Sequence, residues 1–333
     1  MGALQLTVER EKLRLAEPFR ISGYVFEETE VVVATVSDGE HGGRGEGGGV
    51  YYLNDDADRM VADIEAARPA IEAGIDRQEL RALMPACGGR NAVDCALWEL
   101  EAKRAGKAAW QLAGIDKPAP LVTTFTCGAD EPAAMAAKAL SYEGARAIKI
   151  KLTGDLALDL ERVGAIRAAL PKVWIGVDAN QGFSIAELPE LVTGLETLDV
   201  ALVEQPLARG READMEGFES SIPLAADESA LTLDDVPEIA GRFDVFNIKL
   251  DKCGGLTEAL MIAEACRKSG LKVMVGNMVG TSLAMAPAFI VGQYCDVVDL
   301  DGPTFLARDR EPSIDYRDGT VFAGPRVWGG SAE

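Results

Sequence analysis

The chain has 333 residues, and its 54 Asp and Glu residues outnumber its 33 Lys and Arg residues, which gives a formal net charge of −21 at pH 7. This length suits about two domains, and 48% hydrophobic with 26% charged residues is the composition of a globular protein with a large core. So negative a chain repels nucleic acid and anionic membrane surfaces, and we expect neither as a partner. The single histidine, His41, excludes multi-histidine metal sites and, unless His41 itself serves, serine–histidine catalytic triads.

The cysteines and the first residues of the chain indicate in which cellular compartment the protein is expected. The six cysteines contain no Cys-x-x-Cys pair, and the first residues lack the apolar core of a signal peptide. We therefore expect a cytoplasmic protein with reduced, buried thiols. The uncharged stretch 273–295 is long enough to cross a bilayer, but Asn277, Pro287 and its glycines favour a buried strand, loop and core helix.

Residues 1–118 are expected to form an α+β capping domain. The β-branched run 30–36 predicts a strand that ends at the turn signal Asp38-Gly39. The glycine-rich segment 41–49 predicts a flexible loop that could serve as an active-site lid. The segment 91–100 has its apolar positions on one helical face, with Asn91 and Asp94 resembling an N-cap pair, and a proline-rich boundary follows at 117–120.

From residue 119 to 310 the chain repeats a strand followed by a helix. The predicted strand ends lie 22 to 27 residues apart, and helical patterns such as 157–170 and 256–269 fill the gaps. Eight such strands, without a full-length helix after the last, predict an α/β fold with a (β/α)7β TIM-like barrel. The hairpin signal Asp318-Gly319 suggests that residues 311–333 fold back and complete the capping domain. The predicted strand ends are Thr126, Lys151, Asp178, Glu204, Asp227, Lys249, Gly276 and Asp299.

Three of these ends are carboxylates on successive strands: Asp178, Glu204 and Asp227. The carboxyl ends of barrel strands converge on one mouth, so we expect the three side chains to meet. Unpaired, they would repel one another, whereas a hard divalent cation relieves the repulsion, and all-oxygen ligands suit Mg²⁺. Separate salt bridges are the alternative, but three acids on consecutive strands favour one Mg²⁺ per subunit.

Lysines flank the three acids. Lys149 and Lys151 alternate along one strand, so both ammonium groups point to the same side. Lys249 ends a strand four places further on, which is the opposite side of an eight-strand circle. Burial near a second cation lowers the pKa of a lysine, which allows it to act as a base near neutral pH. The alternative, simple neutralisation of the acids, is most credible for Lys149.

Opposed lysines and a metal indicate one chemistry. The metal polarises a substrate carboxylate, one lysine removes the adjacent α-proton, and the metal holds the resulting enediolate. The other lysine then returns a proton to the opposite face. We therefore expect an isomerase that inverts a carbon next to a carboxylate.

Several motifs resemble the enolase superfamily, in the branch of the muconate lactonizing enzymes, over nearly the whole chain. The resemblance implies Mg²⁺ on Asp178, Glu204 and Asp227, acid/base roles for Lys151 and Lys249, and enolate stabilisation by Lys149. The motifs are the segments 90–100, 149–151, 178–180, 204–206, 227–229 and 247–255.

The eighth strand narrows the expected substrate. Asp299 and Asp301 lie on one side of that strand, and two acids near a metal site suit the α-ammonium group of a peptide. In the family that the chain resembles, this Asp-x-Asp marks dipeptide epimerases, and the nearest resemblance is to L-Ala-D/L-Glu epimerases. We therefore expect a small dipeptide as the partner molecule, inverted at its C-terminal residue, while a homo-oligomer stays open.

The cap loops bear on the second side chain of the dipeptide. Glutamate-specific relatives carry an arginine where this chain has Gly23, and Arg20 differs from it in strand parity. The loop 49–55 is apolar and aromatic, and it is followed by Asp56. L-Ala-D/L-Glu is thus one option, and a hydrophobic or cationic second residue is favoured. The candidate substrate-binding residues are Tyr24, Phe26, Thr126, Met278, Asp299 and Asp301.

Two other functions compete with dipeptide epimerisation. An o-succinylbenzoate synthase or a muconate cycloisomerase of the same superfamily would keep the metal and the lysines without needing Asp299 and Asp301. A non-catalytic metal-binding barrel would tolerate replacement of Lys151 and Lys249.

Overall fold

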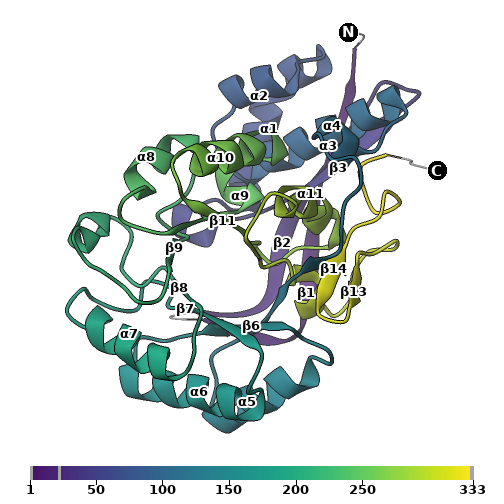
Figure 1. The fold of residues 1–333 in the computed structure, drawn as a ribbon. Coiled ribbons are helices and arrows are strands. Elements are labelled where there is room, and N and C mark those ends of the chain that lie inside the picture. The colour runs from purple at the N-terminus through teal and green to yellow at the C-terminus, as the bar shows by residue number, and fades with distance from the viewer. Residues whose placement is uncertain (1–2, 22–23, 331–333) are drawn as a thin grey trace.

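A computed structural model of the chain describes residues 3–21 and 24–330, and Figure 1 shows its fold. Three antiparallel strands, β1 (Gln5–Ile21), β2 (Tyr24–Ser37) and β3 (Gly42–Gly48), form a sheet in that order. The second half of β2, residues 31–36, is buried on both faces because Val33 packs into the barrel core, whereas Val32 and Ala34 pack into the core of the capping domain. The cap helices are η1 (Tyr51–Leu53), α1 (Ala57–Glu72), α2 (Arg77–Leu83), α3 (Gly88–Ala105) and α4 (Ala109–Leu112).

The glycine-rich segment is a buried strand, so the prediction of a flexible loop is wrong. Its glycines alternate toward α3, whose backbone lies against the strand. A Cβ atom on Gly43 would lie 2.0 Å from the carbonyl oxygen of Ala96, and one on Gly45 would lie 2.1 Å from that of Ala92. Only glycine permits this approach of strand to helix.

The start of α3 also differs from the sequence-based prediction. The helix begins at Gly88 with Cys87 as its N-cap, so Asn91 and Asp94 lie inside it rather than at its cap. Both are buried and point across the domain boundary. The Asn91 amide donates to Asp251 Oδ1 at 2.8 Å, and Asp94 accepts from the hydroxyl and the amide of Thr257.

Eight parallel strands form the barrel, in the order β12-β11-β10-β9-β8-β7-β6-β5 (Figure 1). The predicted helices 157–170 and 256–269 are confirmed, each to within a residue. The strands are β5 (Thr124–Cys127), β6 (Ala147–Lys151), β7 (Trp174–Asp178), β8 (Leu202–Glu204), β9 (Leu224–Ala226), β10 (Val245–Ile248), β11 (Lys272–Val275) and β12 (Val297–Val298). The helices are α5 (Pro132–Ser141), α6 (Leu156–Ala169), α7 (Leu188–Thr197), η2 (Glu212–Met215), η3 (Leu233–Asp235), α8 (Val236–Ile239), α9 (Leu250–Cys253), α10 (Leu256–Lys268), α11 (Ser282–Gly292) and η4 (Gly302–Phe305).

Side chains join the first and last barrel strands. The Thr123 hydroxyl accepts from the amide of Leu300, and the Thr124 hydroxyl donates to Asp299 at 2.5 Å. The amide of Thr126 donates to Asp301 Oδ2 at 2.6 Å. The circle is therefore closed partly by the residues of the predicted ammonium site.

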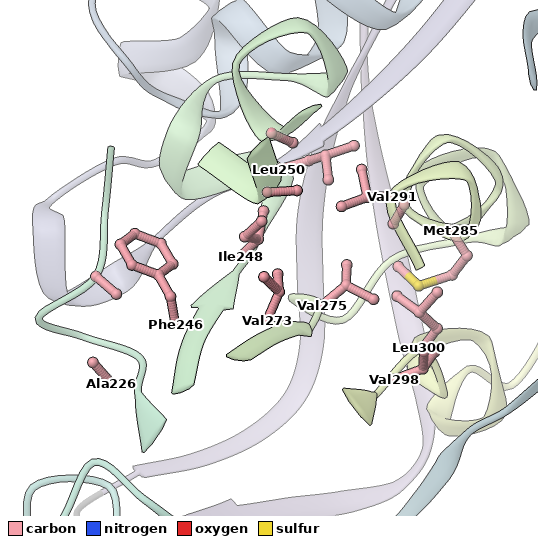
Figure 2. Packing of buried hydrophobic residues seen from close by; sticks show 14 of the residues in the cluster. Ala226, Phe246, Ile248, Leu250, Val273, Val275, Met285, Val291, Val298 and Leu300 are labelled. Carbon is pink, nitrogen blue, oxygen red and sulfur yellow. The ribbon is translucent and has the colours of Figure 1, made fainter. Parts of the chain in front are cut away.

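Successive side chains of the barrel strands point alternately outward, into the hydrophobic core, and inward, toward the barrel interior and the candidate site. Phe246 and Ile248 of β10 point outward into the large cluster between strands and helices, which Figure 2 shows together with Val273 and Val275 of β11. The residues that alternate with these along each strand point into the barrel. Four of them form a small apolar cluster there, namely Leu202, Ala225, Val245 and Met274. Continuing the same parity along β8, β9 and β10 places Glu204, Asp227 and Lys249 above this cluster, at the carboxyl mouth.

The tail contacts both parts of the molecule. The predicted hairpin forms from β13 (Asp315–Arg317) and β14 (Thr320–Phe322), and β14 pairs with β4 (Leu121–Val122), just before the first barrel strand. Further on, the Trp328 indole donates to the carbonyl of Arg44 in the cap sheet. None of the described helices is long and apolar enough to span a membrane, and the stretch 273–295 forms β11, a loop and α11, as expected.

Candidate active site

Three carboxylates meet where β7, β8 and β9 end. Asp178 and Glu204 are the last residues of β7 and β8 and are paired in the ladder, and Asp227 directly follows β9. One oxygen of each lies within 4.8 Å of the others, and all three side chains are buried. The repeat spacing and the strand parity together produce this cluster.

Lysines approach the carboxylate cluster from strands on either side of it. The Lys151 Nζ atom, at the end of β6, lies 2.6 Å from Asp178 Oδ2. The Lys249 Nζ atom, directly after β10, lies 2.6 Å from Asp227 Oδ2. β6 and β10 are four strands apart in the barrel order, with β7, β8 and β9 between them. The structure thus brings one lysine to the first acid and one to the third.

Lys149 occupies the interior of the same cluster. Its ammonium group lies 2.7 Å from Glu204 Oε2, 2.9 Å from Asp299 Oδ2 and 3.1 Å from Asp178 Oδ2. A side chain held by three carboxylates has little freedom to move. This geometry suits a fixed positive charge rather than a proton carrier.

Burial and mutual attraction shift the pKa values in the cluster. Burial alone would raise the pKa of Asp178, but the ammonium groups of Lys151 and Lys149 outweigh it and lower that pKa to about 2. Burial and the charge of Asp178 raise the pKa of Glu204 to about 8. Burial alone would lower the pKa of Lys249, yet the carboxylate of Asp227 outweighs it and raises that pKa. The expectation of a lowered lysine pKa is therefore wrong for Lys249 in this structure, because its carboxylate partner dominates.

A fourth buried lysine was missed by the sequence reasoning. Lys252 lies one helical turn after Lys249, and its Nζ atom lies 2.5 Å from Asp227 Oδ1, 2.6 Å from the Asp227 carbonyl oxygen and 3.0 Å from that of Asn247. The Asn247 amide in turn donates to Glu204 Oε1 at 2.8 Å. These contacts hold the carboxylates of Asp227 and Glu204 in place. Its spacing of three residues from Lys249 makes Lys252 a weak sequence signal, because two of its contacts are backbone carbonyls, which leave no residue-specific pattern.

Glu228, directly after Asp227, was also missed. Its carboxylate is almost fully buried, and Oε1 accepts a long hydrogen bond of 3.4 Å from the Asn180 amide. Burial and the charge of Asp227 raise its pKa to about 7.

The donor set fits a divalent cation. Glu204 Oε2 is buried and accepts no hydrogen bond, although the Lys149 ammonium lies 2.7 Å away. Six buried carboxylates stand around the mouth against four buried lysines, so that acids outnumber bases there. An all-carboxylate set of this kind suits a hard cation. The six acids are Asp178, Glu204, Asp227, Glu228, Asp299 and Asp301, and the four lysines are Lys149, Lys151, Lys249 and Lys252.

Asp299 and Asp301 lie at the mouth but are engaged with the protein. Asp299 accepts from Thr124 and Lys149, and Asp301 accepts from the Thr126 amide. Burial and the charge of Asp299 raise the pKa of Asp301 to about 7. Neither acid lines the cavity described next, whereas Thr126 lines an adjacent cavity of about 530 Å³.

A cavity of about 330 Å³ lies over the two opposed lysines, between barrel and cap. Lys151 and Lys249 both line it, as do the predicted residues Met278 and Phe26. The predicted residue Tyr24 begins β2, but its side chain lies outside the described part of the chain, as does Gly23. The cavity therefore offers a small molecule simultaneous access to both lysines.

Comparison with known proteins shows that the chain matches two domain families of enzymes. Residues 131–325 match the family described as enolase C-terminal domain-like, and residues 3–114 match the mandelate racemase/muconate lactonizing enzyme N-terminal domain. The chain is 37% identical over 316 residues to the L-Ala-D/L-Glu epimerase of Escherichia coli strain K12, covering 94% of this chain and 98% of that one.

Two solved structures are similar throughout. One is an enolase family member from Agrobacterium tumefaciens with homology to dipeptide epimerases, solved with bound sodium and L-Ala-L-Glu. It has a TM-score of 0.94 and 40% identity, and the match covers 98% of this chain and 100% of that one. The other is a dipeptide epimerase from Enterococcus faecalis V583 complexed with Mg and L-Leu-L-Tyr. It has a TM-score of 0.91 and 27% identity, and the match covers 97% and 98% of the two chains.

Proposed function

Because the chain belongs to the enolase superfamily, with both a mandelate racemase/muconate lactonizing enzyme N-terminal domain and an enolase-like C-terminal domain, we propose how its residues carry out the reaction of a dipeptide epimerase. The protein is an isomerase, a dipeptide epimerase that uses Mg²⁺. The observation that carries this function is the pair of lysines on either side of a carboxylate cluster, facing one cavity.

Asp178, Glu204 and Asp227 are the proposed Mg²⁺ ligands. When bound, the ion polarises the substrate carboxylate and makes the neighbouring α-proton more acidic. Lys252 donates to one oxygen of Asp227 and Asn247 to one oxygen of Glu204, which orients both carboxylates and leaves Asp227 Oδ2 beside Lys249 and Glu204 Oε2 beside Lys149. Lys149 supplies a fixed positive charge for the negative charge that develops on the substrate carboxylate.

Lys151 and Lys249 are the proposed acid/base pair. One takes the α-proton of the C-terminal residue on its Nζ atom, and the other gives a proton to the opposite face of the same carbon. Because the reaction is reversible, each lysine acts as base for one diastereomer and as acid for the other. Before either lysine can serve as a base, its ammonium group must leave its carboxylate partner and give up a proton to solvent, because only the neutral amine can accept the α-proton.

Asp299 and Asp301 are proposed to bind the α-ammonium group of the dipeptide, next to Thr126. Two buried carboxylates beside one cation give strong charge-assisted hydrogen bonds. On this proposal the wild type prefers a free amine over an N-acetylated dipeptide, as judged by kcat/KM. The double variant Asp299→Asn/Asp301→Asn should lose this preference, and an unchanged preference would reject the ammonium site.

Incubation in heavy water tests the function itself. With Mg²⁺ present, deuterium should enter only the α-position of the C-terminal residue of an L,L-dipeptide, and the L,D-dipeptide should accumulate. Lys151→Ala should abolish epimerisation. A wild type that exchanges no α-proton in any dipeptide of a broad library would reject the assignment.

We propose the domain division that the sequence indicates, with a cap formed by 1–118 and 311–333 around a barrel of 119–310. The hydrogen bond from the Trp328 indole to the Arg44 carbonyl supports a tail that is fastened to the cap. The net charge of −21 supports a protein without nucleic-acid or membrane partners, and its free cysteines support a reducing compartment such as the cytoplasm. Light scattering would measure whether it forms a homo-oligomer.

A further inference from the structure

The capping domain gives the cavity an acidic and aromatic wall. We define the cap wall as Glu28, Glu30, Tyr51, Tyr52, Asp55 and Asp56, all of which line the cavity over the lysines. Glu28, Glu30 and Asp56 are exposed to solvent, whereas Asp55 is buried. The rings of Tyr51 and Tyr52 meet edge to face, with 5.1 Å between their centroids.

No described cation that lines the cavity is free to offset this wall. Lys151 and Lys249 are paired with Asp178 and Asp227. Nearby, Lys12 forms an exposed 3.4 Å ion pair with Glu28, and Arg59 donates to the carbonyl groups of Leu53 and Asn54; neither lines the cavity. The sequence of residues 21–24 carries no charge. The cap side of the cavity is therefore strongly negative.

Unsatisfied acceptors give an independent indication of the ligand. Asp55 is only 4% exposed, and its Oδ2 atom accepts from the Gly88 amide, while its Oδ1 atom is buried with no hydrogen-bond partner. Glu228 Oε2 and Asn180 Oδ1 are also buried without a partner, and both side chains line the same cavity. Leaving a buried acceptor without a donor is unfavourable, so these three acceptors favour a ligand rich in hydrogen-bond donors.

We propose that the second residue of the preferred dipeptide carries a cationic side chain, an alkylammonium or guanidinium group, that docks on the cap wall. This inference rests on the proposed dipeptide epimerase function and specifies its substrate class. Such a side chain supplies donors to the unsatisfied oxygens and charge to the acids, and its stem packs on the tyrosine rings, where cations also bind favourably. A glutamate side chain would meet like charge there, and an aliphatic one would leave the acceptors without donors.

The direct test compares three dipeptides that differ at the end of the second side chain. L-Ala-L-Lys and L-Ala-L-norleucine share the same aliphatic stem, and L-Ala-L-Glu carries the opposite charge. With Mg²⁺ present, we expect kcat/KM for L-Ala-L-Lys to exceed that for L-Ala-L-norleucine by about tenfold or more, and that for L-Ala-L-Glu by a larger factor. L-Ala-L-Arg should behave like L-Ala-L-Lys, and the advantage should shrink as salt is raised.

Two variants probe the cap wall without touching the acid/base lysines. In Glu28→Gln/Glu30→Gln, two of the three exposed charges of the cap wall are removed, and kcat/KM for L-Ala-L-Lys should fall roughly threefold to tenfold while that for L-Ala-L-norleucine stays unchanged. Asp55→Asn keeps an acceptor for the Gly88 amide and should lower the preference for lysine over norleucine. The matched control is Glu27→Gln, an exposed glutamate on the same strand that does not line the cavity, which should leave the preference unchanged.

The outcomes separate this inference from the function on which it rests. Epimerisation of L-Ala-L-norleucine or L-Ala-L-Glu with equal or greater kcat/KM than L-Ala-L-Lys would overturn the cationic side chain and leave the dipeptide epimerase intact. A lysine preference that the Glu28→Gln/Glu30→Gln and Asp55→Asn variants both keep would overturn the cap wall as its cause. Absence of α-proton exchange in all of these dipeptides, and in a wider library, would reject the function itself.

Discussion

Lys252 shows how single residues set the charge around the metal ligands. Its ammonium group is fully buried and is held by the carboxylate and carbonyl of Asp227 and by the carbonyl of Asn247. Removal of one partner from a buried ion pair costs about 3–5 kcal/mol when the other charge is left fully unpaired, and less here because Lys249 also pairs with Asp227. The lysine therefore balances Asp227 as well as positioning it.

Lys252→Met, which keeps most of the side chain without its charge, should lower the free energy of unfolding in the presence of a chelator by up to about 3 kcal/mol, because Lys249 still pairs with Asp227. The loss should be smaller in saturating Mg²⁺, because a cation on the carboxylates replaces part of the missing charge. Urea denaturation with and without Mg²⁺ measures both values. The exposed Lys172→Met is the control and should change stability by less than about 0.5 kcal/mol. An equal loss in both conditions would contradict this role.

The sequence is informative about residues that stand at strand ends and poor for those that do not. Asp178, Glu204 and Lys151 could be placed because the repeat and the period of two fix where they point. Lys252 lies one helical turn beyond a strand, and two of its partners are backbone carbonyls, which carry no residue-specific pattern. The unsatisfied Asp55 Oδ1 likewise depends on how cap and barrel pack.

At the scale of elements, β3 and α3 are packed so closely that the strand must be built from glycine. The predicted flexible loop was wrong because glycine has low strand propensity, and this strand owes its stability to the helix against it and to its pairing with β2. The barrel strands are rich in Ile and Val and could be predicted from the sequence. β3 can be recognised as a strand only from its contacts with β2 and α3. β3 also positions Gly48, whose amide donates to Asp251, two residues after Lys249.

Gly45→Ala should destabilise the protein by about 1–3 kcal/mol or more, because the new Cβ atom would lie 2.1 Å from the Ala92 carbonyl oxygen. Gly42→Ala on the same strand is the matched control, since its nearest neighbours would lie at 3.9 Å. The control should stay within about 1 kcal/mol of the wild type. Thermal unfolding of both variants measures the difference, and similar stabilities would show that strand and helix are not in close contact.

The whole molecule depends on charge balance at the barrel mouth. Burial raises the pKa of Glu204 to about 8 and that of Asp251 to about 7. Between the unfolded values near 4 and these folded values, the folded chain binds more protons than the unfolded one. Without metal, these groups therefore make the free energy of unfolding fall as pH rises from about 4 to about 8. Asp178 acts in the opposite sense, because its lowered pKa stabilises the fold above pH 4 and this contribution is lost toward pH 2.

Mg²⁺ should therefore stabilise the protein more at pH 8 than at pH 5, because it binds ionised carboxylates and must displace protons at the lower pH. At a concentration one hundred times its Kd, the gain is about 2.7 kcal/mol. The Tm in Mg²⁺ and in chelator, measured across this pH range, gives the difference directly. Glu204→Gln should remove most of the response. A Mg²⁺ effect of equal size at both pH values would argue against a site made of these acids.

The barrel as a whole was predictable because strand ends recur every 22 to 27 residues, and a regular repeat leaves few alternative folds. The closure of the barrel was not predictable from the sequence. Its first and last strands are joined by hydrogen bonds of Thr123, Thr124 and Thr126 to residues about 175 positions away. Long-range pairings of this kind leave no local pattern. The same holds for the pairing of the tail hairpin with β4.

The central claim is that two lysines work on opposite faces of one α-carbon, and single-lysine variants test it most directly. In heavy water with Mg²⁺, Lys151→Ala and Lys249→Ala should each fail to epimerise a dipeptide that the wild type converts. Each variant should still exchange the α-proton of one diastereomer, and the two variants should differ in which diastereomer that is. Loss of exchange with both diastereomers in both variants, or epimerisation by either variant, would contradict the two-lysine arrangement.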